Sequence, residues 1–121
     1  IITIIVVVAL IGGAVFLSRV PDRPGTLDTF ASCLAEKGAM FYGAFWCPHC
    51  NDQKALFGRS QSNIPYTECS TPDGEGQLQV CTDKGITGYP TWEFADGTRQ
   101  GGVLSLEALG ERTSCPVTFD E

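Results

Sequence analysis

The first seventeen residues of this 121-residue sequence contain no charged side chain, and the whole chain contains one histidine and one methionine. Positive charge is also scarce, with eight Lys and Arg against fourteen Asp and Glu and a net charge of −6. So few basic groups exclude nucleic acid as an expected partner, because binding to phosphates depends on Lys and Arg. The sequence has no internal repeat or low-complexity tract. About a hundred residues after the apolar start are enough for one domain with its own core.

Cysteine, in contrast, is abundant, with six residues in this short chain. Proteins of the cytosol rarely keep stable disulfides, so six cysteines indicate an oxidising compartment. The folded part is therefore expected outside the cytosol.

The N-terminal segment 1–17 is an unbroken apolar run with small residues near its end, at 12–14. At about 1.5 Å per residue it would reach roughly 26 Å as a helix, close to the hydrocarbon thickness of a bilayer. We interpret it as a single membrane-spanning anchor preceded by further residues, since no initiating Met is present; a cleaved signal peptide is the alternative. The chain is then expected to divide into an anchor or signal segment (1–18), a linker (19–25), a folded domain (26–115) and a tail (116–121).

The spacing of apolar residues predicts helices and strands in alternation. Thr26 and Ser105 are candidate N-caps, Gly38 is a candidate helix-ending residue, and Asp96-Gly97 suits a hairpin turn. An α/β class follows, with a central mixed sheet of about four strands and helices on both faces. The expected helices are 26–38, 48–57, 77–84 and 106–112, the expected strands are 40–45, 64–68, 91–94 and 99–103, and 70–76 is an expected loop.

Two cysteines, Cys47 and Cys50, stand between the apolar segment 40–45 and a helical one that opens with Pro48. In the first turn of a helix this spacing brings both sulfurs together, with Cys47 near unpaired N–H groups. A thiol attacks a disulfide only as thiolate, and such surroundings favour the anion. We therefore expect a reversible disulfide at Cys47 and Cys50, with half of a zinc site or an inert bridge as alternatives.

The residues inside and beside this pair support that chemistry. A helix dipole contributes only about 0.3–2 kcal/mol, so His49 is expected to help stabilise the Cys47 anion and make the disulfide form an oxidant. An exposed bystander is the alternative for His49. Trp46 adjoins the reactive sulfur and is expected to form an apolar surface for unfolded or membrane-embedded partners. The other strand aromatics are expected in the core: Phe41, Tyr42, Trp92 and Phe94.

Pro90 heads an expected strand and follows Tyr89. On sequence alone an ordinary trans turn proline is the simpler interpretation. A cis bond would leave the preceding backbone free to pair with an extended substrate beside Cys47. Tyr89 and Pro90 are therefore candidate substrate-binding residues.

Four cysteines remain after the redox pair, and six allow fifteen pairings. Cys69 and Cys81 flank the glycine-rich loop, and a bridge between them would contribute roughly 3 kcal/mol by constraining the unfolded chain. Cys33 and Cys115 would then tie the first helix to the tail. A metal site of Cys47, Cys50, Cys69 and Cys81 is the alternative, but the second pair lacks the tight spacing of a zinc knuckle. No metal or other cofactor is expected.

Over residues 27–112 these features resemble the thioredoxin superfamily, with Phe45 to Cys50, the Tyr89-Pro90-Thr91 segment and the Asp96-Gly97 turn as the carrying motifs. The sequence is more closely similar to the thioredoxin-like domain attached to bacterial vitamin K epoxide reductase homologues. The segments that carry this closer resemblance are 42–50, 53–54, 56–58, 68–70 and 88–93.

The resemblance implies a thioredoxin fold, a cis Pro90 facing the redox pair, a nucleophilic Cys47, a resolving Cys50 and a structural bridge between Cys69 and Cys81. It also implies that a quinone-reducing membrane partner supplies oxidising equivalents. The Pro-His dipeptide is that of the DsbA-type oxidants. One position departs from thioredoxin and DsbA-type proteins, which have an acid six residues before the first cysteine. Phe41 stands there, so proton transfer at Cys50 must use another group or water.

Together these observations predict a thiol-disulfide oxidoreductase, held to the cell membrane by one helix, with its thioredoxin-like domain on the extracytoplasmic side. It would donate disulfides to reduced secreted proteins and be reoxidised by a quinone-linked membrane protein of the vitamin K epoxide reductase or DsbB type. A disulfide reductase or isomerase supplied by a transmembrane electron carrier is one alternative. A redox-inert module that binds peptides at Pro90 is another.

Overall fold

The computed structural model describes residues 25–121 of the chain. The expected anchor at 1–18 and the linker at 19–25, except its last residue, lie outside the described residues. Within 25–121, no helix is long and apolar enough to cross a membrane.

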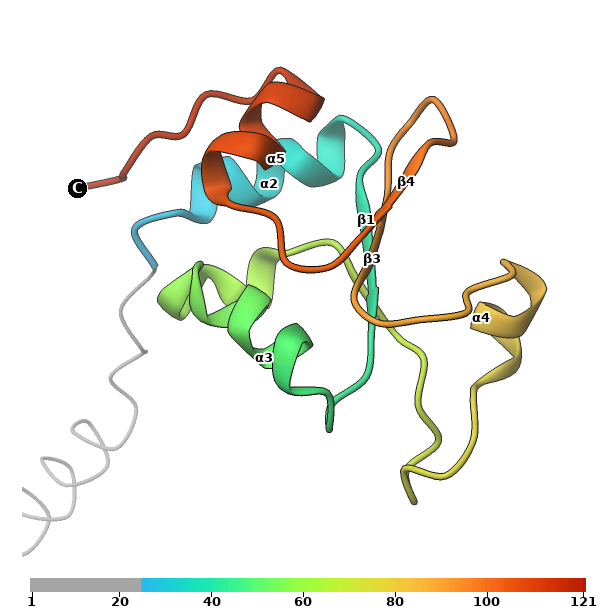
Figure 1. Ribbon diagram of the computed structural model, residues 1–121. Helices are drawn as coiled ribbons and strands as arrows, with labels where there is room; N and C mark the ends of the chain where they lie inside the picture. The colour runs from blue at the N-terminus through green and yellow to red at the C-terminus, as the bar shows by residue number, and fades with distance from the viewer. Residues whose placement is uncertain (1–24) are drawn as a thin grey trace, which may run out of the picture.

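Four strands form one mixed sheet in the order β2-β1-β3-β4 (Figure 1). The central strand β1 (Met40–Gly43) pairs in parallel with β2 (Tyr66–Glu68) and antiparallel with β3 (Thr91–Glu93). The hairpin partner β4 (Arg99–Gly101) completes the sheet. The expected four-strand mixed sheet is therefore confirmed, with the segment before the two free cysteines at its centre.

Helices cover both faces of this sheet, as expected. The helices α2 (Asp28–Glu36), α3 (Pro48–Ala55) and α5 (Leu106–Thr113) gather on one side, together with a 3₁₀ helix, η1 (Gly58–Asn63). The short helix α4 (Gln79–Asp83) lies on the other side (Figure 1).

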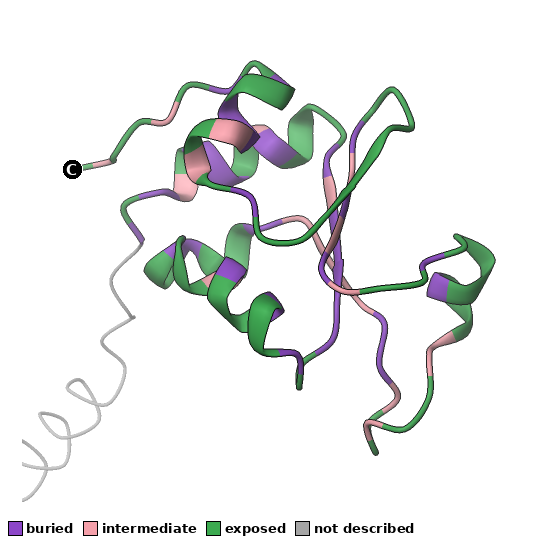
Figure 2. Cartoon of the chain, viewed as in Figure 1, coloured by how far each residue is buried: buried purple, intermediate pink, exposed green. Residues whose placement is uncertain are grey.

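Alternation along β1 explains why both faces are covered. Phe41 belongs to the large core under α2, α3 and α5, whereas Tyr42 belongs to a small cluster with Cys81 and Ile86. Adjacent side chains on a strand point to opposite faces, so an apolar central strand requires cover on each side. Figure 2 shows buried positions on the helices and along β1, whereas β4 is exposed. The expected core positions Phe41, Tyr42, Trp92 and Phe94 are all buried.

The first helix is shorter than the expected 26–38, and the prediction of Thr26 as N-cap is wrong. Helix α2 begins after Leu27, which has no side-chain cap, while the Thr26 carbonyl accepts the Asp120 N–H at 2.6 Å. Ser60 instead accepts the Leu27 N–H at 2.8 Å, so a group distant in sequence replaces the local cap. Gly38 does follow the helix end with a positive φ of 81°.

The other boundaries differ by a few residues for local reasons. The expected strands 40–45 and 64–68 shorten to β1 and β2, and 91–94 and 99–103 shorten to β3 and β4. The expected helix 77–84 starts only at Gln79, because Gln77 pairs with Ser70 in an isolated bridge. The expected helix 48–57 ends at Ala55, and η1 follows without a sequence signal. Helix α5 has the expected Ser105 cap, whose side chain accepts the Ala108 N–H at 3.1 Å.

Two disulfides have the pairing that the sequence analysis favoured. Cys33, on α2, is bonded to Cys115, which follows α5. Cys69, which follows β2, is bonded to Cys81 on α4. The C-terminal tail, 116–121, runs back to α2, where the Asp120 carboxylate accepts the Thr29 N–H at 3.0 Å.

Gln53 on α3 joins three parts of the fold and is fully buried. Its amide nitrogen donates to the Leu104 carbonyl at 2.9 Å. Its oxygen accepts the Leu104 N–H at 2.8 Å and the Trp92 indole N–H at 3.0 Å. These bonds fix α3 against β3 and the segment that leads into α5.

Replacing Gln53 with Leu is expected to lower the free energy of unfolding by about 2–5 kcal/mol, because three buried polar groups would lose their partners. Urea denaturation of the oxidised protein measures this change. Gln100→Leu, on the exposed strand β4, is the control and should change stability by less than about 0.5 kcal/mol. Equal effects of the two substitutions would contradict the role given to Gln53.

Candidate active site

The two cysteines outside the disulfides, Cys47 and Cys50, lie at the junction of β1 and α3. After Gly43 the chain turns through a hydrogen bond from the Cys47 N–H to the Ala44 carbonyl at 3.1 Å. Cys47 is then the N-cap residue of α3, with Pro48 in the first turn. The sequence analysis placed the pair between an expected strand and the helix that opens with Pro48, and the structure has it there.

The two thiols differ in their surroundings. Cys50 has no exposed surface, whereas Cys47 is 7 % exposed and lies beside the exposed side chains of Phe45 and Trp46. Burial, aided by the neighbouring Cys47, raises the pKa of Cys50 to about 12, although a backbone hydrogen bond at Ala44 and the charge of Lys54 act in the opposite direction. In the reduced domain Cys50 therefore keeps its proton at neutral pH, and Cys47 is the thiol nearer to solvent.

The segment with Tyr89 and Pro90 faces the redox pair. The Tyr89-Pro90 bond is cis, Pro90 is buried, and the Cys47 sulfur lies 3.8 Å from the Tyr89 carbonyl oxygen. This is the arrangement that the family resemblance implied, and it differs from the trans proline favoured on sequence alone. The role of Tyr89 and Pro90 in binding substrate stays a prediction.

Trp46 is held beside the thiols by two contacts. Its indole N–H donates to Ser70 Oγ at 2.8 Å, and its ring meets that of Tyr89 edge-on with centroids 6.0 Å apart. The side chain is still 49 % exposed. Trp46 is thus an exposed and anchored aromatic ring next to Cys47, and its expected role as a surface for partners stays a prediction.

His49 lies in the first turn of α3 with its side chain 74 % exposed, and its Nδ1 is 3.8 Å from an Asp52 carboxylate oxygen. Its effect on Cys47 remains a prediction.

Glu68 was not recognised as a site residue from the sequence. Its carboxylate accepts the Phe45 N–H and the Ser70 N–H, each at 3.1 Å, and the Tyr66 hydroxyl at 2.9 Å. It thus connects the turn before Cys47 to the segment that carries Ser70, the partner of Trp46. A Glu at the end of a short strand has no local pattern that would reveal these contacts.

The four-cysteine metal alternative does not agree with the structure, because Cys69 and Cys81 are bonded to each other. Within 25–121, no group of three or more His, Cys, Asp or Glu side chains could hold a metal ion. Two free thiols on one helical turn can instead alternate between dithiol and disulfide.

The four-strand sheet with helices on both faces fits a thioredoxin-like fold, and the two free thiols at the start of α3 give it the site of a disulfide-exchange protein. A search of curated proteins finds a thiol-disulfide oxidoreductase of Arabidopsis thaliana, named LTO1, that is 35 % identical over 132 aligned residues. The alignment covers 91 % of this chain but 35 % of the relative, so the chain spans about a third of that protein's length. No protein-family model matches the chain. The site and this similarity together support thiol-disulfide oxidoreductase activity.

The raised pKa of Cys50 predicts how stability depends on pH. In the unfolded chain this thiol ionises near its ordinary value of 9.0, whereas the folded domain keeps the proton up to about 12. The unfolded state therefore gains ionisation free energy first, and the reduced domain should lose stability as the pH rises between these two values. Chemical denaturation of the reduced wild type and reduced Cys50→Ala, at about pH 8 and about pH 11, measures the effect. Between these two pH values the wild type should lose more stability than Cys50→Ala, which lacks the titrating thiol. An equal loss in both proteins would contradict the prediction.

His49 provides a second prediction. His49→Ala is expected to make the reduction potential of the Cys47 and Cys50 pair more negative by about 20–40 mV, because the dithiol form loses a group that stabilises the Cys47 anion. Equilibration with glutathione buffers measures the potential. Gln79→Ala, on the exposed part of α4, is the control and should leave it unchanged. A potential for His49→Ala equal to that of the wild type would remove this role.

Proposed function

We propose that this chain is a membrane-tethered donor of disulfides to reduced secreted proteins, acting outside the cytosol. The observation that carries the proposal is the asymmetry of the thiol pair. Cys47 is next to solvent, the Tyr89 carbonyl and an exposed aromatic surface, whereas Cys50 is sealed behind it. An incoming substrate can therefore reach only one of the two sulfurs, which is what an ordered exchange requires.

The proposed reaction begins with the Cys47 and Cys50 pair as a disulfide. A substrate thiolate attacks the Cys47 sulfur, forms a mixed disulfide and displaces Cys50 as a thiolate, which takes up a proton. A second thiolate of the substrate then attacks the substrate sulfur of the mixed disulfide and releases Cys47. The substrate leaves with a disulfide, having lost two electrons and two protons, and the domain has become a dithiol.

The direction of this exchange is supported by the residues around the pair. Phe41 stands where thioredoxins and DsbA-type proteins have an acid, and it is fully buried. The lack of that acid makes a reductase of thioredoxin type less favoured. His49 lies within the helical turn that would have to stabilise the Cys47 anion. A more stable anion favours the dithiol, and a domain that prefers the dithiol form is an oxidant.

The proposed partner is a quinone-linked membrane protein of the vitamin K epoxide reductase or DsbB type. The support is the apolar N-terminal segment 1–17, the sequence resemblance to domains attached to such enzymes, and a relative about three times as long as the matched region. The membrane tether would keep the domain near this partner, which would restore the disulfide by accepting two electrons. No cofactor of the domain itself is required, because the disulfide carries the electrons.

Trapping tests the proposal in the full chain. Cys50→Ala removes the thiol that resolves the mixed disulfide, so Cys47 should stay covalently bound to its partners in the native host. Reduced secreted proteins and a quinone-linked membrane protein should be captured, and the Cys47→Ser/Cys50→Ala double variant is the control that should capture neither. Capture of electron carriers alone would indicate a reductase or isomerase instead.

The reduction potential of the wild type tests the direction independently. A value near about −120 mV would support donation, whereas a value near about −270 mV would show that the domain works as a reductant. Alkylation that leaves activity intact, or full activity of Cys47→Ser, would mean that the domain is a peptide-binding module without redox function.

A further inference from the structure

The buried position of Cys50 makes its thiolate form unfavourable. Whenever the pair is reduced, this sulfur must leave as an anion inside the protein, where charge is costly. The strand below it offers no acid that could give this sulfur a proton, because Phe41 occupies that position, packed between aromatic rings with centroid distances of 5.1 Å to Trp92 and 5.0 Å to Tyr66. A positive group is therefore needed to offset the charge.

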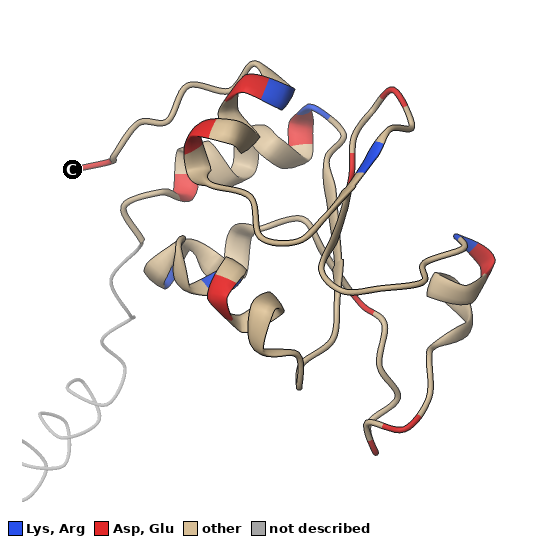
Figure 3. Ribbon diagram, in the orientation of Figure 1, with Lys and Arg blue, Asp and Glu red and all other residues tan. Residues whose placement is uncertain are grey.

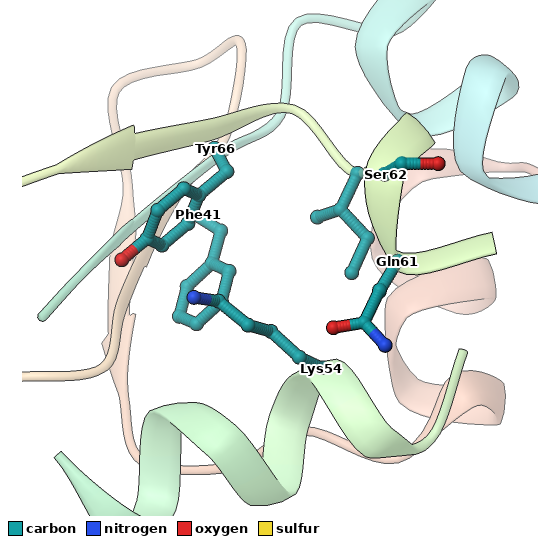
Figure 4. A pocket seen from close by; sticks show the side chains of 6 residues that line it. Phe41, Lys54, Gln61, Ser62 and Tyr66 are labelled. Atoms are coloured by element: carbon teal, nitrogen blue, oxygen red, sulfur yellow. The ribbon is translucent and has the colours of Figure 1, made fainter. Parts of the chain in front are cut away.

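A cavity of about 490 Å³ opens beside this strand, between α3, η1 and β2. Among the six described residues that line it, Lys54 alone carries a charge (Figure 4). The other basic residues are scattered over the described elements (Figure 3). The residues that line the cavity are Phe41, Lys54, Gln61, Ser62, Ile64 and Tyr66.

Lys54 is held close to Cys50 by two features. It follows Cys50 by four residues on α3, so both side chains lie on the same face of the helix. Its ammonium nitrogen is 4.1 Å from the centre of the Tyr66 ring, a cation–π contact that fixes the end of a flexible chain. Figure 4 shows the Lys54 side chain extending across the cavity toward the Phe41 and Tyr66 rings.

Tyr66 in turn lies against the same point of β1 as the Cys50 sulfur. A methyl group added at Gly43 would come within 3.0 Å of both the Cys50 sulfur and the Tyr66 ring. The ring that holds the ammonium group is therefore a close neighbour of the buried thiol.

The other ionisable groups near Cys50 are already committed. The Tyr66 hydroxyl donates to Glu68, and burial raises the pKa of Tyr66, so it keeps its proton. The Glu68 carboxylate accepts two backbone N–H groups as well as that hydroxyl. Cys47 is occupied in the mixed disulfide when Cys50 leaves. Lys54 remains as the group whose charge has the right sign.

We propose that Lys54, held over the Tyr66 ring, is the positive charge that stabilises the Cys50 thiolate during disulfide exchange, until solvent supplies the proton that Phe41 cannot. This inference rests on the proposed function and adds a residue to its mechanism. Lys54 is not a nucleophile and forms no bond; it acts through its field on the Cys50 sulfur.

Lys54 assists the step in which the Cys50 sulfur leaves the disulfide. A thiolate attacks the Cys47 sulfur and forms a new S–S bond, the bond between Cys47 and Cys50 breaks, and its electron pair stays on Cys50 beside the ammonium group. The Cys50 thiolate then takes a proton from solvent. In the reverse direction Cys50 loses that proton and attacks the mixed disulfide at Cys47.

Rates of reduction of the oxidised full chain by dithiothreitol test the inference. Lys54→Met keeps the length of the side chain but removes its charge, and it should slow reduction by about three- to tenfold, because a less stabilised thiolate leaves more slowly. Lys54→Arg should restore a rate within about twofold of the wild type. Lys37→Met removes an exposed charge beyond the end of α2 and is the matched control, with no expected effect.

A second readout separates this electrostatic role from a structural one. In a Cys47→Ser background, the ultraviolet absorbance of the Cys50 thiolate followed against pH should have its midpoint at higher pH after Lys54→Met and near the original value after Lys54→Arg. Tyr66→Phe, which keeps the ring under the ammonium group, should leave the midpoint unchanged, whereas Tyr66→Leu should raise it.

Equal rates and midpoints for Lys54→Met and the wild type would overturn the inference while leaving the proposed function intact. An equal loss in Lys54→Met and Lys54→Arg would also overturn it, since the packing and not the charge would then matter. A wild-type protein that dithiothreitol cannot reduce at Cys47 and Cys50 would instead contradict the proposed function itself.

Discussion

The site depends on a close approach of helix α3 to strand β1 at Gly43. Because this residue has no side chain, the Cys50 sulfur can lie directly against the central strand, where any added Cβ would come within 3.0 Å of it. With α3 held in this position, Cys47 in its first turn faces the Tyr89 carbonyl. Burial of one thiol and access to the other are thus two consequences of one backbone contact.

The rest of the fold keeps this contact in place. Gln53 bonds the next turn of α3 to Trp92 and Leu104, and Glu68 holds the turn before Cys47. The two remaining disulfides tie α2 to the C-terminal segment and β2 to α4. A bond between Cys47 and Cys50 closes only a short loop, so opening it removes little constraint from the unfolded chain. The domain can therefore change its redox state while its architecture is carried by other interactions.

Much of this could be predicted from local sequence patterns. The mixed sheet, the helix after the cysteine pair, the Ser105 cap and the pairing of Cys69 with Cys81 follow from periodicity, capping chemistry and loop closure. The long-range contacts could not. Ser60 caps α2 from 33 residues away, Gln53 meets Leu104 across 51 residues, and the Asp120 carboxylate reaches back to Thr29. The partners of a polar side chain depend on tertiary packing, which a periodic pattern does not encode.

The same reasoning explains why Lys54 and Tyr66 gained no role from the sequence. A lysine on a helix and a tyrosine in an edge strand are ordinary residues until the fold brings both beside a buried sulfur. The sequence showed that Phe41 stands where an acid is expected, but not which group would stabilise the Cys50 thiolate. The geometry points to Lys54 for that role.

The central claim is that Cys47 and Cys50 form the exchanging pair while the other four cysteines are structural. Mild reduction of the oxidised full chain by glutathione, followed by alkylation and peptide mapping, tests it most directly. The account predicts label on Cys47 and Cys50, with Cys33, Cys69, Cys81 and Cys115 still in disulfides. Label on Cys69 and Cys81 before Cys47 and Cys50, or uniform label on all six, would contradict it.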